Sequence, residues 1–546
     1  MMPCIPTLVA ILLILHSSDA SLRVDPLVNT NLGLIRGVRA TDGNYAMFMG
    51  IPYAQVNASN PFGKAIPQEP FDDIFEADDD SAICPQIEEF NKTTTGSLDC
   101  LHLNVYVPTI ANTANPVPVL VWIYGGGFSI GFAGRLLYGP KYIVRHDVIL
   151  VTLNYRVGAY GFMCLDTPEN PGNEGFKDQL LALRWVKENI QAFGGDPNKI
   201  TLFGESAGGI SVDFQILTQK EKLFDRAILQ SGTSLLPTFP EPLKNSPLIL
   251  AEHLGYVTND INDALSFLSN ADTNLIVDAT SELGLNFRFR PCVEKQFEGV
   301  ESFITEDWKQ APMPKVNGMP ILIGFNDHER LSNYFGDTAG EFNAFDVFKA
   351  RLNLAFNISD SNFDGMEELA QRFYLGDEEV SAEQVMDIID FDSDIHFNHP
   401  TYRSISKYLD NDAANIYFYM FSYVGNRNFI KRKNNINIGG AAHADEIGYL
   451  FDISLYEETP TAEDQRVIDQ MTTLWTNFAK YGNPTPETSE LLPFEWTPIK
   501  KGSPYHYLDL GSELKMGTRP FHRRMAFWDL FYRANRDLEI VYPGSD

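Results

Sequence analysis

An α/β fold with a large, mostly parallel central sheet, covered by helices on both faces, is predicted for this chain of 546 residues. The first observation behind this prediction is a set of short apolar runs, rich in β-branched residues, that are typical of buried strands. The second is a long amphipathic helix between two of these runs, because strands that alternate with helices form parallel sheets. The expected strands are residues 117–124, 148–154, 200–203, 227–230, 321–324 and 416–421.

The helix is expected over residues 174–193, where apolar residues recur at steps of three and four. A Gly-Gly-Asp-Pro segment at residues 194–197 has the composition that ends helices. Hydrophobic residues make up 44% of the chain, which is enough for a large core, and no internal repeat or long linker interrupts it. We therefore expect a single domain over residues 21–546.

The first twenty residues have the features of a secretory signal. Residues 5–15 are apolar, and Ser18-Asp19-Ala20 offers a small-residue cleavage site. No later run reaches the length of a membrane span, so we expect a secreted, extracellular protein without a membrane anchor. Three glycosylation sequons agree with export, at Asn57, Asn91 and Asn357.

The net charge limits the possible binding partners of the chain, and its cysteines limit the possible disulfides and metal sites. The chain carries 42 basic and 72 acidic residues, a formal net charge of −30, which argues against nucleic acid and anionic lipid surfaces. Four cysteines follow the signal and allow three pairings. Cys84 and Cys100 bracket a polar segment, whereas Cys164 and Cys292 lie among apolar neighbours and are expected to be free buried thiols. No CxxC motif or Cys/His cluster predicts a metal site, and no cofactor is expected.

The pattern G-x-S-x-G occurs twice, at residues 127–131 and 204–208. In this pattern a serine can sit on a sharp strand-to-helix turn, with its hydroxyl facing substrate and the next N–H facing a developing oxyanion. Only the second copy has the required context, because a strand is expected at residues 199–203 and a helix at residues 207–217. Ser206 is therefore the predicted nucleophile.

A serine hydroxyl needs a base, and the base needs an acid that orients it. His443 lies at a loop tip that follows the strand at residues 416–421, and Glu329 lies just beyond the strand at residues 321–324. The order Ser206, Glu329, His443 is the order of the catalytic triad in the α/β-hydrolase fold.

The copy around Ser129 has a different predicted role. Three glycines at residues 125–127 end a strand, so the backbone there can approach a ligand without a Cβ clash. We expect the N–H groups of Gly126 and Gly127, together with that of Ala207, to hold the oxyanion.

A basic island precedes His443 in an otherwise acidic chain. A solvated loop is the simpler interpretation, and a rim that attracts acidic groups to the site is the alternative. The island consists of Arg427, Lys431, Arg432 and Lys433.

Along nearly all of its length after residue 20, the chain resembles the type-B carboxylesterases, the carboxylesterase/cholinesterase family, and is similar to secreted insect esterases. The matching segments are FMGIPYA (48–54), DCLHLNVY (99–106), WIYGGGF (122–128), NYRVG (154–158), FGGDP (193–197) and GESAG (204–208).

The resemblance implies a serine carboxylesterase that hydrolyses small-molecule carboxylic esters through an acyl-serine intermediate, without a cofactor. It assigns the triad and the oxyanion hole to the residues named above. It also implies a Cys84–Cys100 disulfide and a structural Arg156–Asp178 bridge. Finally, it suggests that Phe287 and Phe289 line the acyl pocket.

Departures from the family pattern weigh against three alternatives. Cholinesterases place a tryptophan before the second cysteine of this segment to hold a quaternary ammonium, and none lies between Cys84 and Cys100. Juvenile-hormone esterases usually carry glutamine where Glu205 stands. A non-catalytic adhesion or ligand-binding relative usually lacks the nucleophile or the base, and this chain keeps both. Residue 98 is leucine where the family usually has glutamate, and the arginine that usually pairs with that glutamate is also missing. These two departures argue against a structural ion pair at this place and do not concern the catalytic residues.

Overall fold

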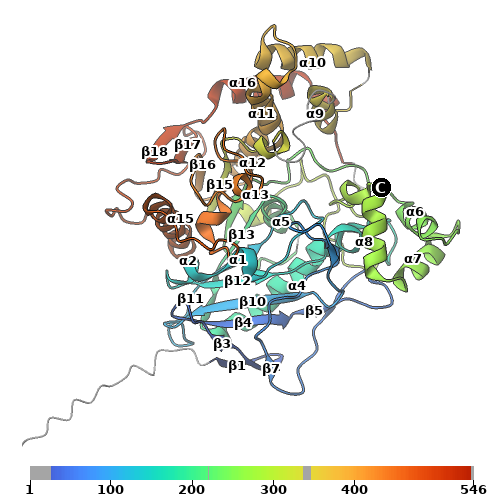
Figure 1. Ribbon diagram of the computed structural model, residues 1–546, viewed down its shortest axis with the longest axis vertical. Coiled ribbons are helices and arrows are strands. Elements are labelled where there is room, and N and C mark those ends of the chain that lie inside the picture. Colours follow the sequence, from blue (N-terminus) through green and yellow to red (C-terminus); the bar gives the residue numbers. More distant parts are fainter. Residues whose placement is uncertain (1–25, 219, 336–345, 359, 543–546) are drawn as a thin grey trace, which may run out of the picture.

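The computed structural model describes residues 26–542, apart from residues 219, 336–345 and 359. Its centre is a sheet of eleven strands, in the order β18-β17-β16-β15-β14-β13-β11-β12-β10-β4-β3 (Figure 1). The middle of this sheet is parallel, as the alternation of strands and helices predicts. Its parallel strands are β11 (Val117–Ile123), β12 (Ile149–Leu153), β13 (Gly195–Glu205), β14 (Arg226–Gln230), β15 (Ile321–Asn326), β16 (Ile416–Phe421) and β17 (His506–Leu510).

Antiparallel strands complete both edges of the sheet. They are β3 (Val38–Arg39), β4 (Tyr45–Pro52) and β10 (His102–Pro108) on one side, and β18 (Leu514–Thr518) on the other. Short strands from the N-terminal part of the chain pair with one another in small sheets outside the central sheet. They are β1 (Leu27–Thr30), β2 (Gly33–Arg36), β5 (Ala54–Gln55), β6 (Ile66–Pro67), β7 (Phe75–Glu76), β8 (Gln86–Ile87) and β9 (Thr94–Thr95).

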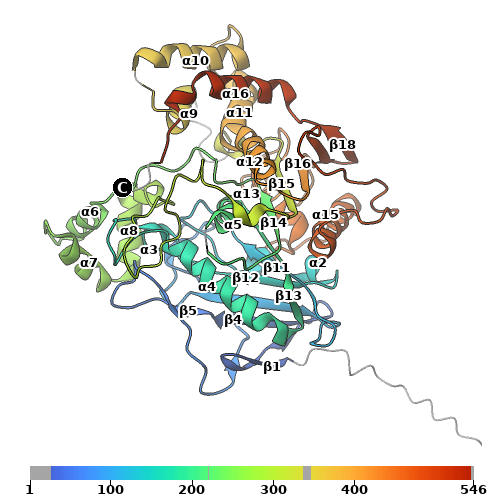
Figure 2. The same cartoon turned by 180° about the vertical axis from the view of Figure 1, so that it is seen from behind.

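Helices cover both faces of the sheet. The helix α4 (Glu174–Asn189) crosses in front of the strands in Figure 2 and contacts α5 (Ala207–Leu217) on the same face. The helices α2 (Lys141–Val144) and α15 (Ala462–Tyr481) contact each other and strands of the sheet. A 3-10 turn (Ile190–Phe193) extends α4 to the end predicted from its apolar periodicity.

Further helices form two groups outside the sheet (Figures 1 and 2). One group is α6 (Ser246–His253), α7 (Ile261–Ser269) and α8 (Thr273–Glu282). The other is α9 (Val347–Ala355), α10 (Asp360–Leu375), α11 (Val385–Ser393), α12 (His399–Asp410) and α16 (His522–Ala534). The shortest helices are α1 (Arg135–Tyr138), α3 (Gly158–Phe162), α13 (Phe429–Lys433) and α14 (Ile447–Leu450).

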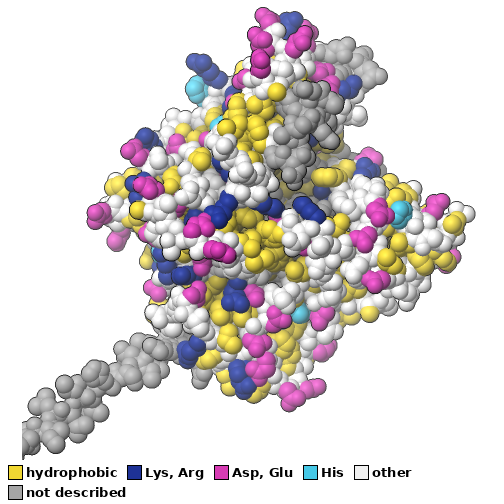
Figure 3. All heavy atoms as spheres, in the orientation of Figure 1, with side chains coloured by type: hydrophobic (Ala, Val, Ile, Leu, Met, Phe, Trp, Pro, Cys, Tyr) yellow, Lys and Arg dark blue, Asp and Glu magenta, His cyan; other side chains and the backbone are white. Residues whose placement is uncertain are grey.

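The surface agrees with the acidic composition. On the face drawn in Figure 3, hydrophobic side chains gather near the centre with Lys and Arg beside them, and Asp and Glu are spread over the rest of the face. Among the described residues, no helix is both long and apolar enough to cross a membrane. The predicted signal at residues 1–20 lies outside the described residues.

Candidate active site

Ser206 sits on the turn that the G-x-S-x-G pattern predicts. It follows β13, precedes α5, and has φ 56° and ψ −124°, a strained conformation for a residue with a side chain. A Cβ on Gly208 would lie 2.0 Å from the carbonyl oxygen of Ile123, and a Cβ on Gly204 would lie 2.5 Å from the carbonyl carbon of Gly208. Both glycines are therefore required for the tight crossing of the turn and β11.

The structure brings Ser206, His443 and Glu329 together in one hydrogen-bonded chain. Nε2 of His443 lies 2.8 Å from Oγ of Ser206, and Nδ1 lies 2.7 Å from Oε2 of Glu329. Glu329 is fully buried, and its other oxygen accepts the backbone N–H of Asn326 at 2.8 Å. The His443 side chain remains 23% exposed, so the serine end of the chain is open to a ligand. Ser206 and Glu329 follow the carboxyl ends of β13 and β15, where open α/β sheets place their sites, and His443 comes from the loop after α13.

Two more buried carboxylates surround His443, and sequence reasoning gave them no catalytic role. Oε1 of Glu205 lies 3.1 Å from Nε2 of His443. Glu446 accepts hydrogen bonds from Gln230 at 3.0 Å and from Asn326 at 2.7 Å. In the sequence, both glutamates lie close to the predicted nucleophile and base, which was the available indication of a role. That both side chains point inward becomes apparent only in the folded structure.

The carboxylates set the proton affinity of the site. Burial lowers the pKa of His443, but Glu205 and Glu329 outweigh that effect and raise the pKa to about 9. Burial raises the pKa of Glu205 to about 8, against the lowering effect of His443. The carboxylates thus stabilise the imidazolium that forms when His443 takes a proton from a hydroxyl group, but they also keep His443 protonated, and unable to act as a base, until the pH approaches its pKa.

The predicted oxyanion donors line the space beside Ser206. A Cβ on Gly125 would lie 2.9 Å from the Cβ of Ser206, which places the glycine loop directly against the nucleophile. Gly126 has φ +107°, and a Cβ there would lie 2.3 Å from the carbonyl oxygen of Ile130. Within the described chain, the N–H groups of Gly126, Gly127 and Ala207 donate to no protein acceptor. They are therefore free to bind a ligand oxygen.

The cysteines form two disulfides, which confirms one expectation and corrects another. Cys84 bonds to Cys100, as the resemblance implies. Cys164 bonds to Cys292, so the expectation of free buried thiols was wrong. Apolar sequence neighbours indicate burial, and a buried disulfide satisfies that condition as well as a thiol does. The fold brings together two segments separated by 128 positions, which local sequence does not reveal.

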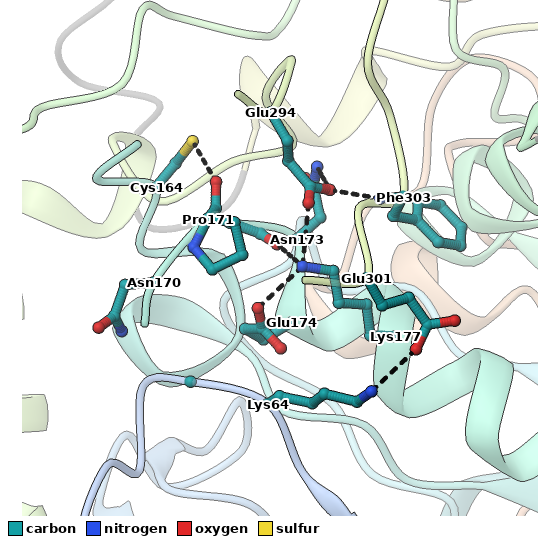
Figure 4. Close-up of polar contacts among 12 residues, drawn as sticks. Lys64, Cys164, Asn170, Pro171, Asn173, Glu174, Lys177, Glu294, Glu301 and Phe303 are labelled. Atoms are coloured by element: carbon teal, nitrogen blue, oxygen red, sulfur yellow. Dashed lines mark hydrogen bonds and ion pairs between the residues drawn. The ribbon is translucent and has the colours of Figure 1, made fainter. Parts of the chain in front are cut away.

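A buried ionic cluster lies next to the second disulfide (Figure 4). Lys177 is held between Glu174 at 2.9 Å and Glu294 at 3.0 Å. Asn173 donates to the carbonyl oxygen of Cys292 at 2.8 Å. The predicted bridge between Arg156 and Asp178 is also present, at 2.7 Å and fully buried. Two cations and three carboxylates are thus paired inside the molecule, which gives these contacts a structural role.

The four side chains of the basic island contact acidic, carbonyl or aromatic groups of the protein, and so they do not form a free rim. Lys433 pairs with Glu89, and Arg432 pairs with Glu458. Nζ of Lys431 donates to the carbonyl oxygens of residues 438–440. Arg427 is buried, and its guanidinium lies 4.9 Å from the ring centre of Tyr456. Neither the solvated-loop interpretation nor the attracting rim describes these four side chains well.

The remaining predicted residues are the two pocket phenylalanines and the three sequon asparagines, and they differ in exposure. Phe289 is 2% exposed, whereas Phe287 is 75% exposed and its ring faces the guanidinium of Arg290. Only Phe289 is therefore packed inside the molecule. Of the sequon asparagines, Asn91 and Asn357 are exposed and Asn57 is partly exposed.

Comparisons with known proteins agree with this geometry. The family model described as "Carboxylesterase family" matches residues 24–528. The chain belongs to the carboxylesterase family. It is a carboxylic ester hydrolase with the α/β-hydrolase fold.

Several esterases with different names are similar to this carboxylesterase. Juvenile hormone esterase of Heliothis virescens is 30% identical over 91% of this chain and 93% of its own length. Cholinesterase of Mus musculus is 32% identical over 93% of this chain and 87% of its own. Esterase FE4 of Myzus persicae is 32% identical over 83% of each chain. In structure, juvenile hormone esterase from Manduca sexta, with OTFP covalently attached, has a TM-score of 0.81, with 28% identity, and covers 93% of this chain and 99% of its own.

Proposed function

We propose that this carboxylesterase is a secreted serine esterase that acts through an acyl-serine intermediate. The observation that carries the proposal is the unbroken contact chain from Glu329 through His443 to Ser206. The covalent attachment of OTFP in the Manduca sexta relative supports a nucleophilic mechanism. The two disulfides support export, because disulfides persist in oxidising compartments.

In this mechanism His443 takes the proton of Ser206 as its Oγ attacks the ester carbonyl. Glu329 holds the imidazole in the required tautomer and stabilises the imidazolium. The N–H groups of Gly126, Gly127 and Ala207 bind the oxygen that becomes negative. His443 then protonates the leaving alcohol, and water hydrolyses the acyl-serine by the same sequence of steps.

Labelling with an organophosphate tests the nucleophile. We expect intact-mass and peptide analysis to find one adduct on Ser206, and no adduct on the Ser206→Ala variant. Hydrolysis of para-nitrophenyl acetate by that variant should fall by about 10³-fold or more. An adduct elsewhere, or unchanged hydrolysis by Ser206→Ala, would refute the proposed mechanism.

Secretion has its own test. The full chain, expressed in insect cells, should appear in the medium with an N-terminus at residue 21, and glycosidase treatment should lower its mass if Asn57, Asn91 or Asn357 carries glycan. Retention inside the cells with an intact N-terminus would contradict export.

A further inference from the structure

Arg290 is a buried cation whose guanidinium is hydrogen-bonded to protein acceptors through Nη1. Its side chain is 6% exposed. Nη1 donates to the carbonyl oxygens of Asn286 at 2.9 Å and Phe289 at 3.0 Å, and to Oγ of Ser129 at 3.1 Å. In the described parts of the chain, Nε and Nη2 have no protein acceptor, and no carboxylate lies within ion-pair distance of the guanidinium.

Two other buried cations of this protein are neutralised by carboxylates, whereas the buried Lys431 is bound by backbone carbonyl oxygens. Arg156 is paired with Asp178, and Lys177 lies between two glutamates. Burial lowers the pKa of Arg290 to about 10, so its guanidinium is still charged at neutral pH. Because a buried charge without a counter-charge is costly, a ligand that supplies the missing negative charge would be bound favourably.

The guanidinium lies beside the glycine loop of the active site. A Cβ built on Gly127 would lie 3.9 Å from Nη2 of Arg290. Ser129, which accepts a hydrogen bond from Arg290, is two residues further along the same loop.

Arg290 and His443 approach the site through different contacts, since His443 lies against Ser206 and Arg290 lies against the glycine loop. The charges that raise the pKa of His443 belong to Glu205, Glu329 and Glu446. The leaving alcohol must receive its proton from Nε2 of His443, so the alcohol half of an ester lies on that side. Arg290 instead contacts Ser129 of the glycine loop, and this position favours the acyl half of the ester as its partner.

We propose that Arg290 selects esters whose acyl group carries a carboxylate or a similar acidic substituent. This inference rests on the proposed serine-esterase function. The acidic group binds Nε and Nη2 while Ser206 attacks the carbonyl, and water then releases a dicarboxylic acid from the acyl-serine. A charge-assisted hydrogen bond of this kind favours the acidic substrate by about 10- to 100-fold.

The test compares two esters of equal shape on the full chain. One is the para-nitrophenyl monoester of adipic acid, and the other carries an isopropyl group in place of the free carboxylate. We expect kcat/KM to be higher for the acidic ester, and Arg290→Met to lower the ratio of the two kcat/KM values by about 10- to 100-fold. Arg290→Lys should retain part of the preference, because it keeps the charge.

A matched control is Arg288→Met, since Arg288 donates to the carbonyl oxygen of Glu241 and should not affect the ratio. The wild-type preference should also weaken with added salt, which can be measured even if Arg290→Met does not fold. Equal rates for the two esters in the wild type, or an equal loss for both in Arg290→Met, would overturn the assignment of Arg290. Loss of all hydrolysis together with the absence of a Ser206 adduct would instead refute the proposed function.

Discussion

At the scale of single residues, the chemistry depends on a histidine that lies between buried glutamate side chains. His443 contacts Glu329 through Nδ1, and both Ser206 and Glu205 through Nε2. Glu329 belongs to the expected triad, whereas Glu205, when ionised, adds negative charge on the reactive side of the ring. The second carboxylate therefore raises the proton affinity of the base without occupying the orienting position.

This arrangement predicts a shift of the pH profile in Glu205→Gln. His443 must be neutral to accept a proton, so kcat/KM falls as the pH drops below its pKa. The Glu205 carboxylate helps to raise that pKa. Its removal should therefore lower the pKa and move the acidic limb to lower pH, by about one unit. The measurement is kcat/KM for a neutral ester as a function of pH between about 5 and 10.

The control is Glu490→Gln, which changes an exposed carboxylate and should leave the limb in place. An unchanged limb in Glu205→Gln, or a limb displaced to higher pH, would contradict the role given to Glu205.

At the scale of elements, a π-helical turn (Asp394–Asn398) between α11 and α12 reaches the base. It places Phe397 against His443, with ring centres 4.7 Å apart and planes inclined by 42°. Phe397 is 7% exposed. Single π-turns of this kind occur often at functional sites, because the wider turn redirects one side chain.

Phe397 is therefore expected to position the imidazole. Phe397→Ala should lower kcat by about 10-fold or more with little change in KM, because a base that can rotate spends less time aligned with Ser206. Phe397→Leu, which keeps most of the volume, should recover part of the rate. Steady-state kinetics on a neutral ester provide the values, and thermal unfolding checks the fold.

Phe373→Ala is the matched control, since Phe373 lies on α10, is 40% exposed and stacks on Phe527. A pure rise in KM in Phe397→Ala, or an equal loss in Phe373→Ala, would show that Phe397 does not act through His443.

The same elements show what could be predicted from sequence. The strands leading to Ser206 and Glu329 are buried on both faces, so their apolar runs stand out, and a catalytic residue at a strand end can be located by position. Phe397 and Arg290 were not predicted as site residues because an irregular turn and a loop bring them in. Contacts of this kind depend on tertiary packing, and neither periodicity nor spacing encodes them. For the same reason, Cys292 was not matched with Cys164.

At the scale of the whole molecule, the disulfides join segments of very different separation. Cys84–Cys100 spans 16 positions, whereas Cys164–Cys292 spans 128 and links the segment after α3 to the segment that carries Arg290. In the chain-entropy model, a disulfide restricts the unfolded chain more strongly when it closes a longer loop.

We therefore expect the paired variant Cys164→Ala/Cys292→Ala to lose about 4–5 kcal/mol in the free energy of unfolding, and Cys84→Ala/Cys100→Ala to lose about 3 kcal/mol. Guanidinium unfolding followed by fluorescence measures both differences against the wild type. A loss below about 1 kcal/mol for the long-range pair, or a clearly larger loss for the short-range pair, would contradict the loop-entropy explanation. Because Cys292 lies two residues after Arg290, the long-range pair should also reduce the preference for acidic esters, whereas the short-range pair should leave it unchanged.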